Sequence, residues 1–261
     1  MYQSLYRILI ELTNGRYSSG LLKHFSQSRW SRALILPYVK AFNLNQQEFG
    51  KGIKEYPNLH ELFTRKLKAE ARPITSAPSA VASPVDGVLE DSGDIMADKK
   101  IVVKGKVYSM EEMLGDELAL EKYLGGKYLV LYLSPSHYHR IHAPVEGSVI
   151  KRWTLGRKSY PVNRWGMKYG KEPLSKNYRT ITELQNETGS LAMVKVGAMY
   201  INSIVITDQS KRLERGQEFS YFSFGSTVVL LFEKNKFELE ETLSVPADVR
   251  VGETIGYMKA V

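Results

Sequence analysis

Short apolar runs, separated by glycine and proline, fill the chain from Val81 onward and constrain its fold more than any other feature. The runs at 127–133, 148–154 and 227–232 are examples. They are rich in β-branched and aromatic residues and are bounded by turn residues, so they predict strands. Further strands are expected at 100–107, 178–184, 191–207 and 218–224.

The first 72 residues have a helical pattern instead. Apolar residues recur at helical spacing in two stretches, Leu5, Ile8, Leu9 and Leu12 and then Trp30, Leu34, Ile35 and Tyr38. Asn58 and Glu61 stand in capping-box spacing before a third stripe. Residues 71–80 contain two prolines and small residues, which is typical of a linker.

Two short repeats lie within the β-rich part. SPVDGVL (83–89) is echoed by APVEGSV (143–149), and RGQEFSYF (215–222) by RVGETIGYM (250–258). Proline, an apolar residue, an acid and glycine before a strand are typical of a turn. The duplication favours a pseudo-symmetric β-sandwich or barrel-like core, with chance similarity as the alternative.

Composition narrows the function classes. The chain has 261 residues and no cysteine, which excludes disulfides, zinc–thiolate sites and cysteine nucleophiles. Its net charge of +8 favours an anionic partner. Residues 1–40 carry six basic residues against one acid, so the N-terminal helices fit either an anionic lipid surface or packing on the protein's own core. We find no RNA-recognition signature, so the charge does not by itself indicate nucleic acid.

Three of the five histidines, His137, His139 and His142, lie in SPSHYHRIHAPVEG (134–147). A strand would put the first two on one face, and a helix would bring the last two together, so no regular element offers all three to one ion. His60-Glu61 lacks the second histidine of a zinc-protease helix. The sequence therefore predicts no metal site, although an irregular loop could form one. Nucleophile-elbow, P-loop and dinucleotide-binding motifs are also missing.

A glycine–serine pair interrupts the apolar stretch YFSFGSTVVLLFEK (221–234). A bulge is the simplest interpretation of Gly225. The pair also suits a reaction, because a serine hydroxyl can attack the carbonyl before it and glycine leaves that carbonyl unshielded. The attack needs a base and oxyanion donors. His142 is the candidate base, and Asp86, in the duplicated turn, is the candidate group that orients it.

Five stretches then carry a family resemblance: ELFTRKL…ARPI, SPVDG, LYLSPSHYHRIHAP, VGAMYINSI and FGST. In this order they resemble phosphatidylserine decarboxylase proenzymes of the shorter bacterial type, from about Pro57 to the C-terminus. Phe224 replaces the commoner leucine of the last motif but only flanks the Gly225–Ser226 bond. The fold that the resemblance implies is α+β, with N-terminal amphipathic helices beside a β-rich, barrel-sandwich-like catalytic core.

The resemblance also implies a self-made cofactor. Asp86, His142 and Ser226 match the family's triad for self-cleavage, which would break the Gly225–Ser226 bond by ester formation and β-elimination. Residues 1–225 would become the β chain, and Ser226 would become a pyruvoyl group at the head of the α chain, residues 226–261. The pyruvoyl group would form a Schiff base with phosphatidylserine and yield carbon dioxide and phosphatidylethanolamine.

We expect different roles for the remaining residues of the histidine loop. His139 matches the residue of the decarboxylation step, where it would protonate the new carbanion. His137 has no assigned role and is expected at the surface of the loop. Arg140 is expected to be structural or to pair with the headgroup.

The resemblance further implies that residues 1–72 form a membrane-associating region and that residues 73–261 form the catalytic domain. The expected partners are phosphatidylserine and an anionic membrane surface, not nucleic acid, with a homodimer left open. The expected location is peripheral, on the cytoplasmic side of the cell membrane. Three alternatives remain at this point: a pyruvoyl decarboxylase of a soluble amino acid, a non-catalytic lipid-binding module, and a metal-dependent hydrolase that uses the histidine loop.

Overall fold

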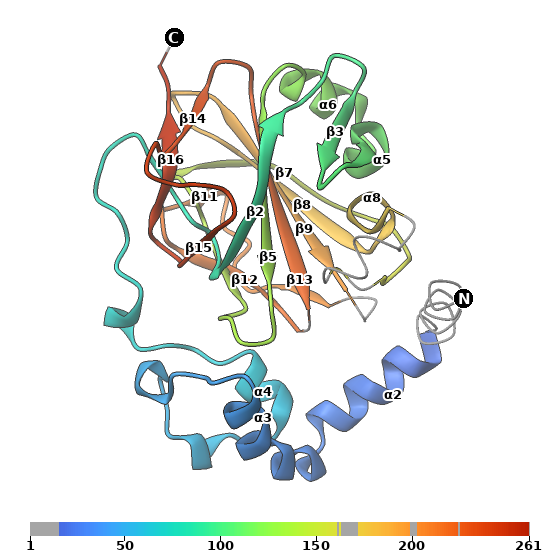
Figure 1. Cartoon of the computed structure of the whole chain (residues 1–261), viewed down its shortest axis with the longest axis vertical. Coiled ribbons are helices and arrows are strands. Elements are labelled where there is room, and N and C mark those ends of the chain that lie inside the picture. Colours follow the sequence, from blue (N-terminus) through green and yellow to red (C-terminus); the bar gives the residue numbers. More distant parts are fainter. Residues whose placement is uncertain (1–15, 161, 163–171, 199–202, 224, 261) are drawn as a thin grey trace.

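The computed structural model describes residues 16–160, 162, 172–198, 203–223 and 225–260. It places helices in the N-terminal part and antiparallel strands in most of the rest, so the α+β prediction is confirmed (Figure 1). The helical stripe expected at residues 5–12 lies outside the described residues. No helix in the described ranges is long and apolar enough to cross a membrane.

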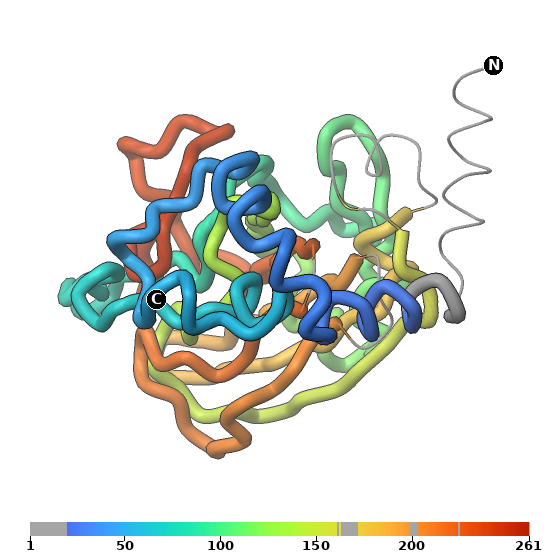
Figure 2. Tube along the Cα trace, turned by 90° about the horizontal axis from the view of Figure 1, so that it is seen from below, coloured from blue at the N-terminus to red at the C-terminus, as the bar shows by residue number. Residues whose placement is uncertain are grey.

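The N-terminal part consists of short helices around a small core of their own. The core residues are Ile35, Val39, Leu44, Phe49, Tyr56 and Leu62. Figure 2 shows this part lying across one end of the β-rich part. The helices are α2 (Arg16–Gln27), α3 (Ile35–Ala41) and α4 (Leu59–Phe63), with 3-10 turns at Arg29–Leu34, Gln46–Glu48, Ile53–Glu55 and Ala69–Ala71.

The apolar stripe on the second helical stretch divides between two directions. Ile35 is buried in the small core, and the Tyr38 hydroxyl donates a hydrogen bond to the Pro135 carbonyl oxygen at 2.7 Å. Trp30 and Leu34 point outward, with 86% and 42% of their surfaces exposed. The stripe therefore serves the protein's own packing on one side and leaves large apolar side chains in solvent on the other.

An open eight-stranded antiparallel sheet forms the centre of the β-rich part, in the order β11-β7-β8-β9-β13-β5-β2-β15. Its strands are β2 (Gly87–Asp94), β5 (Lys127–Leu133), β7 (Gly147–Leu155), β8 (Arg179–Gln185), β9 (Ser190–Gly197), β11 (Arg212–Leu213), β13 (Ser226–Phe232) and β15 (Ala247–Val249). The edge strands β11 and β15 have two and three residues. So few backbone groups cannot form a closing ladder, and no pairing among the described residues makes a barrel.

Both faces of this sheet are covered. On one face lie two three-stranded sheets, β1 (Ala80–Ala82) with β16 (Thr254–Met258) and β14 (Phe237–Leu239), and β10 (Ile204–Ile206) with β12 (Glu218–Phe222) and β6 (Arg140–His142). On the other lie the hairpin of β3 (Lys100–Val103) and β4 (Lys106–Ser109) and the helices α5 (Met110–Leu114), α6 (Glu117–Tyr123) and α8 (Pro173–Lys176).

The central strand β13 is buried on both faces. Val228, Leu230 and Phe232 pack toward the small sheets, and Val229 and Leu231 pack toward the helices. Every residue of the strand is buried. A strand covered on both sides needs apolar residues at successive positions, which explains the continuous run in the sequence.

The two short sequence repeats mark a real structural duplication. In the first half β1 pairs with β16 and β16 with β14, and in the second half β6 pairs with β12 and β12 with β10. The β1–β16 pairing has a register shift at Val81/Ala82, and the corresponding β6–β12 pairing has one at Glu218/Ser220. The halves also exchange backbone bonds, since Ala82 donates to Pro144 at 2.8 Å and His142 donates to Pro84 at 2.9 Å. The pseudo-symmetric core inferred from the repeats is therefore present.

Candidate active site

The Gly225–Ser226 pair lies where the chain passes from a small sheet to the large one. The sequence suggested a bulge within one strand, but β12 ends at Phe222 and β13 begins at Ser226. From Ser226 onward β13 pairs with β5 and β9 without any register shift. The bulge interpretation is therefore wrong, and Gly225 belongs to the connection. Phe224 lies outside the described residues.

The two groups that would react with each other belong to adjacent residues. The Ser226 side chain is fully buried, and its Oγ has no hydrogen-bond partner among the described residues. The Gly225 carbonyl oxygen accepts a hydrogen bond from the Ala198 backbone N–H at 2.9 Å. A Cβ placed on Gly225 would meet no atom within 4 Å apart from those of its chain neighbours, so the space beside the Gly225 Cα is open.

Strand pairing brings Asp86 and the histidine loop to the same end of the sheet. Ser226 pairs with Leu133, the last residue of β5, and the histidine loop leaves the sheet directly after it. On the other side of β5, Asp86 immediately precedes β2. Because neighbouring strands lie about 4.8 Å apart, the backbones at Asp86 and Ser226 are separated by roughly 10 Å across β5.

His142 is held by a carbonyl group and not by the expected carboxylate. Its Nδ1–H donates to the Gly216 carbonyl oxygen at 2.7 Å, which leaves the lone pair on Nε2. Nε2 is buried and has no partner among the described residues. Burial lowers the pKa of His142, and the bond to Gly216 and the nearby carboxylates only partly offset it. The imidazole is therefore neutral, with a free basic nitrogen.

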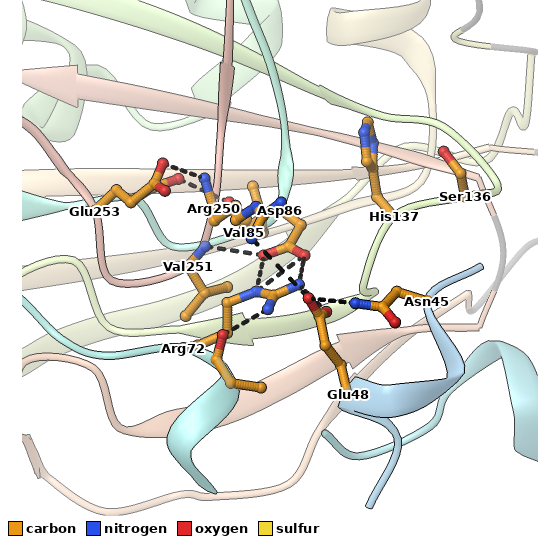
Figure 3. A network of polar contacts seen from close by, with 12 residues as sticks. Asn45, Glu48, Arg72, Val85, Asp86, Ser136, His137, Arg250, Val251 and Glu253 are labelled. Carbon is orange, nitrogen blue, oxygen red and sulfur yellow. Dashed lines mark hydrogen bonds and ion pairs between the residues drawn. The ribbon is translucent and has the colours of Figure 1, made fainter. Parts of the chain in front are cut away.

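Asp86 is engaged elsewhere, as Figure 3 shows. Its carboxylate accepts hydrogen bonds from Arg72, at 2.8 Å from Nε and 2.5 Å from the terminal nitrogen, and from the Val251 backbone N–H at 2.9 Å. Arg72 also pairs with Glu48 at 2.9 Å. Among the described residues no hydrogen bond joins Asp86 to His142, although the charge of Asp86 acts on both His142 and His137 to raise their pKa values.

His139 is the most deeply buried histidine of the loop. Its surface is 0% exposed, and its ring stacks on Phe63 with a centroid distance of 3.9 Å. Neither ring nitrogen has a partner of ordinary geometry among the described residues. Burial, together with the positive charge of Arg65, holds the pKa of His139 well below its usual value. Its backbone carbonyl accepts from the Phe222 N–H at 2.9 Å, beside the Gly225–Ser226 connection.

The other two loop residues have structural contacts. His137, which was expected at the surface of the loop, is half-buried there: its Nδ1 accepts from the Ser134 backbone N–H at 3.0 Å, and burial lowers its pKa. Arg140 donates to the Thr64 carbonyl oxygen at 2.9 Å and pairs with Glu218 at 2.5 Å. Nowhere in the described ranges do three or more histidine, aspartate or glutamate side chains form a group that could hold a metal ion.

Sequence reasoning missed three residues that shape the site. Gly216 supplies the carbonyl that orients His142, and Arg72 and Phe63 hold Asp86 and His139. The signal for Gly216 was its place in the second repeat, where Gly252 is its counterpart. Phe63 and Arg72 lie in the motif ELFTRKL…ARPI, which carries no chemistry of its own in the sequence.

Comparison with known proteins identifies a family. Residues 59–257 match the model of the family described as phosphatidylserine decarboxylase. A phosphatidylserine decarboxylase proenzyme of Geobacillus sp. (strain WCH70) is 56% identical over 259 residues, which cover 99% of this chain and 100% of the relative. Proenzymes of Anoxybacillus flavithermus and Bacillus thuringiensis are each 54% identical, over 99% and 98% of this chain and 97% of each relative. The chain therefore belongs to the phosphatidylserine decarboxylase family.

Proposed function

We propose that this chain is a proenzyme that cuts itself between Gly225 and Ser226 and then decarboxylates phosphatidylserine to phosphatidylethanolamine. The observation that carries the proposal is the buried, unpartnered Ser226 hydroxyl in the residue directly after the Gly225 carbonyl, which the Ala198 backbone N–H holds. A buried hydroxyl without a partner is costly, so its retention at this bond favours a chemical role.

His142 is the base in this proposal. The Gly216 carbonyl fixes its proton on Nδ1, so that Nε2 can take the proton of the Ser226 hydroxyl. Because burial lowers the pKa of His142, the ring stays neutral and basic at pH 7. Asp86 then acts on His142 through its charge and by fixing the turn around Pro84, whose carbonyl oxygen accepts from the His142 backbone N–H.

The Ala198 backbone N–H is the proposed oxyanion donor. It already donates to the Gly225 carbonyl oxygen at 2.9 Å. Attack by the Ser226 oxygen on the carbonyl carbon places negative charge on the carbonyl oxygen, and a fixed donor stabilises that charge without reorganisation. The tetrahedral centre then collapses to an ester as the Ser226 nitrogen leaves with a proton.

Elimination completes the maturation. Loss of the Ser226 α-proton and departure of the Gly225 carboxylate leave a dehydroalanine, which takes up water and releases ammonia. The products are a β chain of residues 1–225 and an α chain of residues 226–261 that begins with a pyruvoyl group. Ser226 is fully buried and its Oγ has no hydrogen-bond partner among the described residues, so the residue that becomes this group is shielded from bulk water. The pyruvoyl carbonyl supplies electron withdrawal that lets the carboxylate of a bound amine leave as carbon dioxide.

His139 is the proposed proton donor of the decarboxylation. Burial and Arg65 keep the ring neutral, so one of its two unpartnered nitrogens carries a proton and the other does not. The stack on Phe63 fixes the plane of the ring and excludes water from one of its faces. The proton is then delivered to the carbon that has lost carbon dioxide and not exchanged with bulk water.

The maturation is tested on a denaturing gel with the intact mass of each band. The wild-type protein is expected to give two chains that divide between Gly225 and Ser226, and Ser226→Ala is expected to give one chain. Release of carbon dioxide from carboxyl-labelled phosphatidylserine should follow the appearance of the cut chain. Two chains from Ser226→Ala would contradict the mechanism.

We further propose that residues 1–72 associate with the membrane and that residues 73–261 form the catalytic domain, with the enzyme on the cytoplasmic side of the cell membrane. Leu21, Trp30 and Leu36 support this, because 75%, 86% and 66% of their surfaces are exposed on the N-terminal helices. Arg29 and Arg32 lie beside them, and each basic residue near an anionic surface contributes about 1 kcal/mol of binding.

A vesicle-sedimentation assay tests this association. Binding to anionic vesicles should weaken as salt rises, because the charge contribution is screened, and should persist in part through the apolar side chains. Trp30→Ser should reduce the part that survives high salt, and Trp153→Phe, a change of a partly buried tryptophan, serves as the control. Equal binding to neutral and anionic vesicles at low salt would contradict an electrostatic contribution.

A further inference from the structure

A cavity of about 500 Å³ lies between the N-terminal helices and the histidine loop. Its lining includes four basic residues, Lys51, Arg65, Lys66 and Arg140, and one acidic residue, Glu61. Lys51 pairs with Glu61 at 3.8 Å, and Arg140 pairs with Glu218 at 2.5 Å. Arg65 and Lys66 have no ion pair with any described carboxylate, so the cavity carries uncompensated positive charge.

Arg65 is a buried cation with incomplete bonding. Only 5% of its surface is exposed, and its Nε has no hydrogen-bond partner among the described residues. Its terminal nitrogens donate to the carbonyl oxygens of Leu62, Ser136 and His137 at 3.2 to 3.4 Å, and its guanidinium lies over the Phe49 ring at 5.2 Å from the centroid. A buried charge without a counter-charge is costly, so the protein keeps Arg65 at this place against its own stability.

A second orphaned donor lines the same cavity. The Tyr56 side chain is 1% exposed, and its hydroxyl has no partner among the described residues. Two unpartnered donors from different segments, next to a lysine on the rim, form a site for an anion that can accept several hydrogen bonds. A phosphate group has this capacity.

The cavity adjoins the reacting groups. Thr64, Arg65 and Lys66 follow Phe63, the residue that stacks on His139, and Arg140 follows His139 directly. Arg65 holds the carbonyls of Ser136 and His137 in the loop that begins beside Ser226. In phosphatidylserine the phosphodiester is only a few bonds from the amine and the carboxylate, so a headgroup at His139 would reach this cavity.

We propose that this cavity binds the phosphodiester of the substrate, with Arg65 and Tyr56 as its anion-binding groups and Lys66 at its rim. The inference rests on the proposed function. The phosphodiester is a better occupant than the seryl carboxylate, because it keeps its charge throughout the reaction. A cation that held the carboxylate would stabilise the ground state and oppose its loss as carbon dioxide.

The test compares the mature wild-type enzyme with Tyr56→Phe and Arg65→Gln on phosphatidylserine dispersed in neutral detergent. Tyr56→Phe should raise KM roughly ten- to hundredfold, as expected for a lost hydrogen bond to a charged group, with kcat nearly unchanged. Arg65→Gln should raise KM at least as much, and it should also change kcat, because Arg65 helps to keep the His139 ring neutral. Arg65→Lys should restore part of the loss. Lys66→Gln should have a smaller effect, and Lys68→Gln, an exposed lysine outside the cavity with the same charge change, should have none.

Three soluble probes identify the group that is bound. Glycerophosphoglycerol, a phosphodiester without amine or carboxylate, should compete with substrate and lose its inhibition in Tyr56→Phe. Free serine should inhibit wild type and Tyr56→Phe equally. Stronger inhibition by inorganic phosphate than by the diester would overturn the substrate subsite in favour of a free-phosphate site.

Two further results would also overturn the proposal. One is a fall in kcat with unchanged KM in both variants, which would make Arg65 and Tyr56 positioning residues for the histidine loop. The other is glycerophosphoglycerol that fails to bind wild type in calorimetry. Calorimetry measures binding without decarboxylation, so it tests this inference separately from the proposed function. Chain cleavage on a gel shows that each variant folds.

Discussion

The two halves of the duplicated core share a backbone and differ in the groups they carry. The carbonyl of Gly252 in the first half accepts from the backbone N–H of Thr75 at 2.9 Å. Its counterpart in the second half, the carbonyl of Gly216, accepts from the imidazole of His142 at 2.7 Å. At the position of His142 the first half has the small residue Ala82. The same acceptor therefore completes a turn in one half and orients a base in the other.

The acidic residue of the repeated turn also differs between the halves, and here the first half carries the buried group. Asp86, in the first half, is 6% exposed and is held by Arg72 and the Val251 N–H. Glu146, its counterpart, is exposed and has no ion pair with the described residues. One half thus supplies the buried carboxylate and the other supplies the base. A duplicated scaffold can place two different groups at one site because each copy is free to vary at the corresponding position.

The largest expected effect is on the rate of chain cleavage, when the His142 side chain is removed. His142→Ala should slow cleavage by roughly 10²- to 10⁴-fold, because Ser226 loses its general base. Thr75→Ala is the matched change in the first half: it removes a side chain but keeps the backbone N–H that the Gly252 carbonyl accepts. It should cleave at the wild-type rate. Both are measured as the rate of chain separation on a denaturing gel after refolding.

The pH dependence of cleavage sharpens the same prediction. Burial lowers the pKa of His142 below 6.5. The cleavage rate should therefore fall to half of its maximum only at a pH below 6.5. A rate that already halves above pH 6.5, or full cleavage of His142→Ala, would rule out this histidine as the base.

Substitutions of the two acidic residues of the repeated turn, Asp86 and Glu146, should have different effects on the free energy of unfolding. Asp86→Asn removes one of the two carboxylates that pair with the half-buried Arg72, which should cost about 1.5–3 kcal/mol of unfolding free energy, as for a hydrogen bond between charged groups. Glu146→Gln should stay within about 0.5 kcal/mol, as for other exposed substitutions. Urea unfolding of both, in a Ser226→Ala background that keeps one chain, measures the difference. Equal stabilities would mean that the Asp86–Arg72 pair contributes nothing net.

The smallest effect concerns a lysine buried beneath the second half. Lys195 of β9 is 0% exposed, donates to Thr182 Oγ1 at 2.7 Å and lies over the ring of Phe219 at 4.6 Å. It has no ion pair with a described carboxylate, and burial holds its pKa well below 10.5. Lys195→Met should therefore raise the unfolding free energy at pH 7 by about 1 kcal/mol, since a buried amine is replaced by an apolar chain of similar length.

The gain from Lys195→Met should depend on pH in a defined direction. Between the lowered pKa of the folded state and 10.5, the unfolded protein binds more protons at Lys195, so wild-type stability rises with pH. The methionine variant lacks this contribution, and the difference between the two proteins should shrink toward pH 10. A constant difference between pH 7 and pH 10 would show that Lys195 keeps an ordinary pKa.

The sequence was informative where a segment's own residues decide its structure. β5 has the bounds that were expected, 127–133, because a continuous apolar run lies between Gly126 and Pro135. Asn58 begins α4 (Leu59–Phe63) as the capping-box spacing predicted, with its side-chain oxygen accepting from the Glu61 N–H at 2.8 Å. In both cases the signal is local, and distant contacts do not alter it.

Prediction failed where the outcome depends on distant partners. A bulge at Gly225 was the simplest interpretation of the connection between the strands expected at 218–224 and 227–232. These two strands belong to different sheets, because a strand's own pattern does not specify its neighbours. The site residues Asp86, His142 and Ser226 were named from motifs, and the structure brings their segments to one end of the sheet. The partners of His142 and Asp86, Gly216 and Arg72, could not be inferred, because neither contact leaves a periodic pattern.

The position of β13 has a consequence for the lifetime of the mature protein. The strand pairs over seven residues with β5 and over seven with β9, and both partners would belong to the other chain after the proposed cut. The α chain, residues 226–261, stays in place after the cut. Folding changes in molecularity, because a single chain folds before the cut and two chains must associate after it. Refolding then depends on concentration, and the uncut precursor is the only form that folds at a rate independent of dilution. Maturation is in this sense a one-way step, because the processed enzyme depends on slow unfolding to persist.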